Sequence, residues 1–131
     1  MNVGSVFDLG KISVGIIPAI HSGNMVVFIV SADGKTIYHA GDTALFSDMK
    51  LISELDKPDV ALLPIGGFLT MGPTEAAIAA DLIQTRDIFP MHCGTWPSIS
   101  KDLRDFAKRV KKSTVHILAQ AKKSNLKSFQ N

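Results

Sequence analysis

Apolar residues along this chain fall into short runs separated by Gly, Pro and Asp. Residues 5–9 and 11–19, with Gly10 between them, have the pattern of two strands, and the nearly continuous apolar run 25–31 is typical of a strand buried on both faces. Asp33-Gly34 predicts a hairpin turn from this run into a strand over 36–40. Further strands are predicted over 60–65, 88–91 and 114–119.

Apolar residues recur at helical spacing between the later strands. Ser47 is the predicted N-cap of a helix that ends near residue 55, and Thr74 is the predicted N-cap of a helix over 75–85. A third helix is predicted over 101–112, whereas residues 120–131 are expected to be a frayed tail. Antiparallel hairpins come first, and strands then alternate with helices. This order predicts one domain of the α/β (α+β) class, a mixed β-sheet with helices on one face.

Composition limits the functional classes. Hydrophobic residues make up 46% of the 131 residues and charged residues 20%, so we expect a packed core. A net charge of +2 argues against nucleic acid or a membrane surface as partner, and no apolar run reaches transmembrane length. A single cysteine excludes an internal disulfide and favours a reducing compartment, so a cytoplasmic location is expected.

Three apolar runs end in residues that ligate metals. Residues 16–20 lead into His21, residues 36–40 lead through Gly41 into Asp42, and residues 87–91 lead into His92. Sites in α/β proteins form at the carboxyl ends of strands. Imidazole and carboxylate are ligands that zinc, iron and manganese accept. We therefore expect His21, Asp42 and His92 to converge on one cleft.

Several separate motifs carry a resemblance to a known family. They are His21-Ser22, the segment from His39 through Gly41-Asp42-Thr43 to Lys50, Leu63-Pro64-Ile65-Gly66, Thr70-Met71-Gly72-Pro73, Pro90-Met91-His92 and Thr95-Trp96-Pro97. In order and spacing they resemble the metal-dependent hydrolase branch of the metallo-β-lactamase superfamily. The resemblance runs from about Val3 to Pro97 and covers only the C-terminal half of that fold.

This resemblance implies half of an αββα sandwich that holds one or two divalent ions, with zinc first and manganese or iron as alternatives. It implies that His21 ligates one ion, that Asp42 bridges both, and that His92 ligates the second. It also implies that a metal-bound hydroxide attacks an ester, lactone, amide or phosphodiester. The loop with Phe68, Leu69 and Met71 is expected to form an apolar wall of the substrate cleft.

Other polar residues near these motifs have two interpretations each. Ser22 and Thr43 support the ligands by hydrogen bonds, or they only close their own turns. We interpret His39 as a structural or supporting residue because strand alternation would place it on the face opposite Asp42. Cys93 is interpreted as a small buried thiol and Trp96 as a core residue. His116 is interpreted as structural.

One departure from the family pattern leaves three hypotheses open. The family's N-terminal His-x-His-x-Asp-His cluster is absent, because the only histidines are His21, His39, His92 and His116. The chain is then a truncated metal-dependent hydrolase, a non-catalytic homo-oligomeric remnant, or one subunit of a split hydrolase with a separate chain supplying the missing half. Because apolar residues occupy both faces of the predicted sheet, we also expect a homodimer through the open sheet face.

Overall fold

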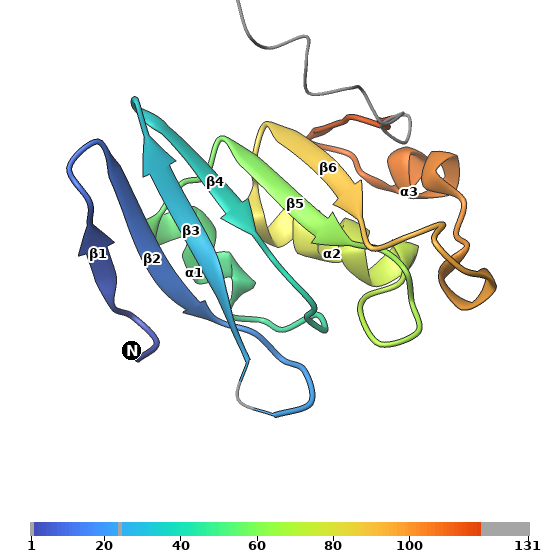
Figure 1. The fold of residues 1–131 in the computed structure, drawn as a ribbon. Helices are drawn as coiled ribbons and strands as arrows, with labels where there is room; N and C mark the ends of the chain where they lie inside the picture. The colour runs from blue at the N-terminus through green and yellow to red at the C-terminus, as the bar shows by residue number, and fades with distance from the viewer. Residues whose placement is uncertain (1, 24, 119–131) are drawn as a thin grey trace, which may run out of the picture.

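The computed structural model describes residues 2–23 and 25–118, and a seven-stranded sheet with the strand order β1-β2-β3-β4-β5-β6-β7 runs through it (Figure 1). The strands are β1 (Val6–Asp8), β2 (Ile12–Pro18), β3 (Val26–Ala32), β4 (Lys35–His39), β5 (Val60–Pro64), β6 (Asp87–Met91) and β7 (Thr114–Val115). The predicted strands are therefore all present within one mixed sheet. The predicted tail over 120–131 lies outside the described residues.

Strand direction decides which loops meet. Neighbouring strands from β1 to β4 are antiparallel, and those from β4 to β7 are parallel. The β3–β4 turn is formed by Asp33 and Gly34, both with positive φ (49° and 71°), which matches the hairpin signal in the sequence. Strands β2, β4, β5 and β6 consequently run in the same direction. Their carboxyl ends lie along one edge of the sheet (Figure 1).

Three helices form the second layer. They are α1 (Met49–Leu55), α2 (Pro73–Ile83) and α3 (Leu103–Arg109), and a short 3-10 helix, η1 (Pro97–Ile99), precedes α3. In Figure 1, α1 and α2 lie behind the sheet and α3 continues this layer beside β6. The core between the layers contains fully buried residues from both, including Tyr38, Leu63, Ala80 and Phe106. Burial raises the pKa of the Tyr38 hydroxyl far above its usual range.

The opposite face of the sheet is not covered by any helix in the described part of the chain. Along β3, Val27 and Ile29 are buried in the core, whereas Val26 and Phe28 are exposed. The prediction that residues 25–31 are buried on both faces is therefore wrong for this structure. The run is apolar throughout, but only one of its two faces meets a second layer.

Both predicted helix caps are wrong by one or two residues. Asp48, not Ser47, occupies the N-cap of α1, and α2 begins at Pro73 after Gly72. Proline is favoured in the first helical turn because its missing N–H would have no partner there, which explains why the helix starts before Thr74. In α3, Asp102 does cap the helix, since its carboxylate accepts the N–H of Arg104. Within the described residues, no helix is long and apolar enough to cross a membrane.

Candidate metal centre

Asp42 is delivered to the sheet edge by a tight turn directly after β4. Gly41 has φ 54°, and a Cβ at this position would lie 2.8 Å from Cγ1 of Val27, so glycine is required for two reasons. The Gly41 N–H donates to Nδ1 of His39 at 3.1 Å. Because β4 ends at His39, strand alternation does not extend to Asp42, and His39 acts here by holding the turn that carries the carboxylate.

His92 stands at the end of β6 in an unusual backbone conformation. Its φ is 52°, in the left-handed region that few residues with a side chain adopt. Gly66 at the end of the neighbouring strand leaves room for it: a Cβ there would overlap the His92 carbonyl oxygen and lie 3.0 Å from its Nδ1. Close contact between two strand ends thus fixes the position of the imidazole.

These two turns bring Asp42 and His92 together. Nε2 of His92 lies 3.6 Å from Oδ1 of Asp42, and their side chains are 25% and 42% exposed. Within the described residues, Nδ1 of His92 is buried and has no hydrogen-bond partner. Metal–nitrogen and metal–oxygen bonds of about 2.0–2.2 Å would let one ion bond both atoms across this gap. In ligand type and separation, the pair fits a divalent cation.

A second His–Asp pair, at the opposite end of the sheet, has a different character. Nε2 of His116 lies 2.8 Å from Oδ1 of Asp87, and Arg86 donates to the other carboxylate oxygen at 2.6 Å. The bond from His116 and that from Arg86 hold the pKa of Asp87 below its usual range. His116 also stacks on Phe89, with ring centroids 4.7 Å apart. Both carboxylate oxygens of Asp87 therefore have partners, and one of these is the positively charged Arg86. The Asp87–His116 pair links β6 to the segment after β7 and does not compete as a metal site.

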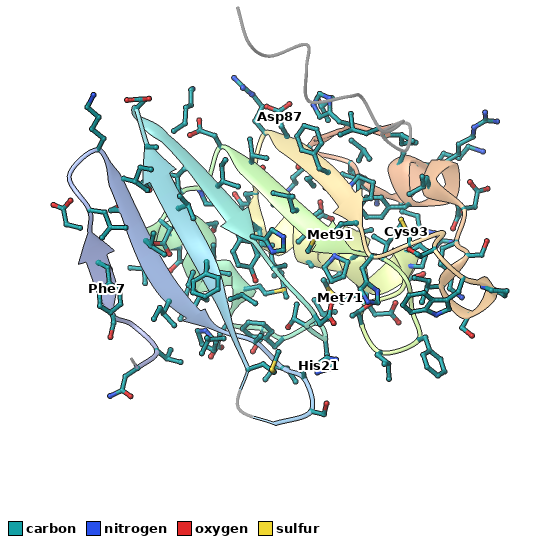
Figure 2. The ribbon with its side chains drawn as sticks, viewed as in Figure 1. Phe7, His21, Met71, Asp87, Met91 and Cys93 are labelled. Atoms are coloured by element: carbon teal, nitrogen blue, oxygen red, sulfur yellow. The ribbon has the colours of Figure 1, made fainter. Side chains whose placement is uncertain are left out.

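His21 lies at the same edge of the sheet as the loops after β4, β5 and β6, opposite to Asp87 (Figure 2). Its Nδ1 is 3.2 Å from Oγ of Ser22. This contact matches one of the two interpretations of Ser22, a hydrogen bond that supports a candidate ligand. In the part of the chain that the structure describes, no group of three or more His, Cys, Asp or Glu side chains is arranged to hold a metal ion. The expected three-way convergence is therefore limited to Asp42 and His92, and the ligand role of His21 stays a prediction.

Thr43 ties the loops of this edge together. Its buried hydroxyl accepts the N–H of Ile20 at 3.0 Å and donates to the carbonyl oxygen of Ala44 at 2.9 Å. Its own carbonyl oxygen accepts the N–H of Met71 at 3.2 Å. Thr43 thus holds the segment before His21 and the loop after β5 against the turn that carries Asp42. In the described part of the chain, the Thr43 hydroxyl bonds backbone groups and not the imidazole of a candidate ligand.

The loop between β5 and α2 contributes to the site differently from the prediction. Phe68 and Leu69 are exposed, and their role as an apolar wall of the substrate cleft stays a prediction. Met71 is buried in the core, so its side chain cannot face a substrate, and this part of the prediction is wrong. Exposed and buried residues follow no regular period in this glycine-rich loop. The sequence alone therefore does not show which of its side chains are buried.

Trp96 is a second residue that sequence reasoning misplaced. It is 49% exposed and not in the core, and its ring lies edge-on to His92 with centroids 6.2 Å apart. The sequence feature that could have placed Trp96 near the site was its position, four residues after the candidate ligand His92. Cys93 is half-buried, and burial raises the pKa of its thiol, which disfavours the thiolate needed for nucleophilic or metal chemistry. A cavity of about 330 Å³ adjoins His92, Cys93 and Thr95.

A protein-family model covers most of the sheet. The family model described as a beta-lactamase superfamily domain matches residues 11–92, a segment that contains β2 through β6, Asp42 and His92. The chain belongs to the beta-lactamase superfamily. Both residues of the candidate pair lie within the matched segment.

Curated relatives carry a more specific name. The chain is 45% identical over 126 residues to a UPF0173 metal-dependent hydrolase of Methanoregula boonei, covering 87% of this chain and 57% of that protein. It is 56% identical over 103 residues to a UPF0173 metal-dependent hydrolase of Pyrococcus abyssi, covering 72% of this chain and 46% of that protein. The chain therefore spans about half the length of the curated relatives it matches.

Solved structures give the same result for the fold. Igni18, a metallo hydrolase from Ignicoccus hospitalis, superposes with a TM-score of 0.84 at 37% identity over 90% of this chain and 56% of its own. The metallo-beta-lactamase fold protein YhfI from Bacillus subtilis superposes with a TM-score of 0.73 at 15% identity, over 88% of this chain and 49% of its own. The mixed sheet with its helices is thus similar to about half of a metallo-β-lactamase fold.

Proposed function

We propose that this chain forms part of a metal-dependent hydrolase in which Asp42 and His92 hold a divalent ion at the edge of the sheet. The observation that supports this proposal is the 3.6 Å approach of His92 Nε2 to Asp42 Oδ1, which places a nitrogen donor and a carboxylate oxygen within reach of one ion. The names of the relatives, metal-dependent hydrolases, agree with this chemistry. Zinc is the ion we propose, because it accepts imidazole and carboxylate in open catalytic sites.

The residues around the pair suggest how a substrate is held. When bound, a divalent ion acts as a Lewis acid and makes water nucleophilic at neutral pH. Asp42 supplies the negative charge that retains the cation, and His92 supplies a neutral nitrogen donor. Exposed Phe68, Leu69 and Trp96 offer apolar surface to the rest of the substrate. An ester, lactone, amide or phosphodiester with an apolar substituent fits these groups, and the lone half-buried Cys93 agrees with a cytoplasmic location.

The number of ligands supports a second candidate, one subunit of a two-chain hydrolase. Two protein ligands are fewer than the three that catalytic zinc sites use. His21, once rotated away from Ser22, is one source of a further ligand, and a separate chain is another.

The activity of an Asp42→Ala variant tests the proposal. The purified chain is assayed with p-nitrophenyl acetate and with bis(p-nitrophenyl) phosphate, with and without added zinc or manganese. We expect Asp42→Ala to lose the metal-dependent part of the rate, because the only charged ligand is removed, while its circular dichroism spectrum is unchanged. If the isolated chain is inactive, the same comparison is made after adding the remaining half of the Methanoregula boonei relative.

Asp87→Ala is the matched control, since it removes the carboxylate of the other His–Asp pair. It is expected to keep the metal-dependent rate. An Asp42→Ala variant that hydrolyses as fast as the unaltered chain would refute the assignment. No metal-dependent activity under either condition would refute the hydrolase itself.

A further inference from the structure

Two consecutive glycines after β5 place a lysine at the same edge of the sheet as the candidate metal centre. Gly66 leaves room for the imidazole of His92. Gly67, with φ 78°, leaves room for Lys101: a Cβ at Gly67 would lie 2.9 Å from Cε and 3.6 Å from Nζ of this lysine. Because consecutive Cα atoms are about 3.8 Å apart, these contacts put the Lys101 ammonium within about 14 Å of Nδ1 of His92.

The loop after β6 carries Lys101 to this position. The Gly94 N–H donates to the carbonyl oxygen of Ile99 at 2.9 Å, and this bond closes the loop that contains Trp96. The side chain of Ile99 is buried, and its Cβ would lie 3.1 Å from a Cβ at Gly66. Lys101 follows two residues later and directly precedes the N-cap of α3. A closed turn and a buried anchor therefore fix its backbone, while its flexible stem can turn the ammonium toward a substrate.

The charge of Lys101 has no ion-pair partner among the described residues. No carboxylate of these residues lies within 4.0 Å of its ammonium. Glu75, in the first turn of α2, has its carboxylate against Gly72 and forms no ion pair with Lys101. Several other cations lie at the opposite edge of the sheet, because they precede or begin the strands that run in the shared direction: Lys11, Lys35, Lys57 and Arg86. A divalent ion held by Asp42 would leave the site positively charged, and Lys101 adds to that charge.

We propose that Lys101 selects an anionic substrate for this site. The inference rests on the proposed function and deepens it. Of the candidate substrates, a phosphodiester carries a negative charge on the group that reacts, whereas an ester, lactone or amide is neutral there. The ammonium of Lys101 attracts that charge across the cleft, so it favours binding of the phosphodiester before any bond is broken. A lysine whose stem only packed against Gly67 would not distinguish charged from neutral substrates.

Binding of an analogue that is not cleaved tests this role directly. Trp96 is the only tryptophan of the chain and its ring lies beside His92, so quenching of its fluorescence by a nitrophenyl group reports binding at this edge. The probes are the monomethyl ester of 4-nitrobenzylphosphonate, which carries one negative charge, and its neutral dimethyl ester. Lys101→Met keeps the stem and removes the charge. We expect it to raise the Kd of the anion about five-fold and to leave the Kd of the neutral ester unchanged.

Two conditions separate the charge of Lys101 from its packing. The effect of Lys101→Met should shrink at about 0.5 M NaCl, where exposed charges are screened, and Lys101→Arg should restore the Kd of the anion. Lys11→Met is the matched control, since it removes the same charge at the opposite edge of the sheet and should leave both Kd values unchanged. Each Kd is measured with zinc and again in EDTA. Lys101 is not a metal ligand, so its effect is expected in both, and a failure of the metal centre leaves this test intact.

Hydrolysis gives a second readout. Lys101→Met should raise the KM for bis(p-nitrophenyl) phosphate by the same factor and leave kcat, and both constants for neutral p-nitrophenyl acetate, unchanged. An unchanged Kd of the anion in Lys101→Met, an equal loss for the neutral probe, or the same loss in Lys11→Met would overturn the proposal. A chain without metal-dependent hydrolysis would refute the proposed function alone, because binding of the phosphonates requires no turnover.

Discussion

At the residue scale, the candidate site depends on two glycines that leave room for neighbouring side chains and backbone. Gly66 and Gly41 stand where a Cβ would collide with His92 and Val27, respectively. The positions of Asp42 and His92 after apolar strands were visible in the sequence, as was a turn at Gly41. The contact between Gly66 and His92 was not, because it joins residues that are adjacent only once two parallel strands have paired.

Replacing Gly66 by alanine should disturb His92 selectively. The added Cβ would overlap the His92 carbonyl oxygen and press on its Nδ1, and overpacking of this kind costs about 1–3 kcal/mol. We expect Gly66→Ala to lower the urea midpoint of unfolding and to weaken the binding of cobalt, a spectroscopic substitute for zinc. Gly15→Ala is the control, since its nearest neighbours would lie 3.9 Å from the new Cβ. Equal cobalt affinity in both variants would show that Gly66 does not position the imidazole.

At the element scale, the succession of strands and helices along the chain could be predicted, but the ends of the elements and their exposure could not. The short strand β7 illustrates the limit: residues 114–119 have a strand pattern, but within the described residues, up to 118, the strand comprises Thr114–Val115. His116, interpreted from sequence as a structural residue, links these strands through Asp87. Its partner is 29 residues away, so local periodicity carries no sign of it.

The link between β6 and β7 predicts a pH dependence of stability. The pKa of Asp87 is lowered by the bond from His116 and by Arg86. A carboxylate with a lowered pKa stabilises the fold above its unfolded pKa of about 4 and loses that contribution as the pH falls through its native pKa. Asp87→Asn should therefore be less stable than the unaltered chain at pH 7, and the difference should shrink below about pH 4.

Chemical unfolding from pH 3 to pH 7 measures this difference. Asp105→Asn, which removes an exposed ion pair with Arg109 within α3, is the control and should change stability little at any pH. A difference between Asp87→Asn and the unaltered chain that stays constant across the range would mean that the Asp87 charge does not link the strands.

At the scale of the whole molecule, strand direction creates the site. Because β2, β4 and β6 run in the same direction, the loops that follow them meet at one edge, and Thr43 binds the first two together. The mixed sheet with helices on one face could be predicted from the order of the runs. Burial could not, because an apolar run does not tell which of its faces another layer covers.

The location of a bound ion is the most direct test of the central claim, that Asp42 and His92 form a metal centre. Crystals grown with zinc and measured at the zinc absorption edge would locate the ion by anomalous scattering. We predict a peak between Asp42 Oδ1 and His92 Nε2, within about 2.2 Å of each. An ion bound elsewhere, for instance at Asp87 and His116, or no peak at this edge of the sheet at millimolar zinc, would contradict the claim.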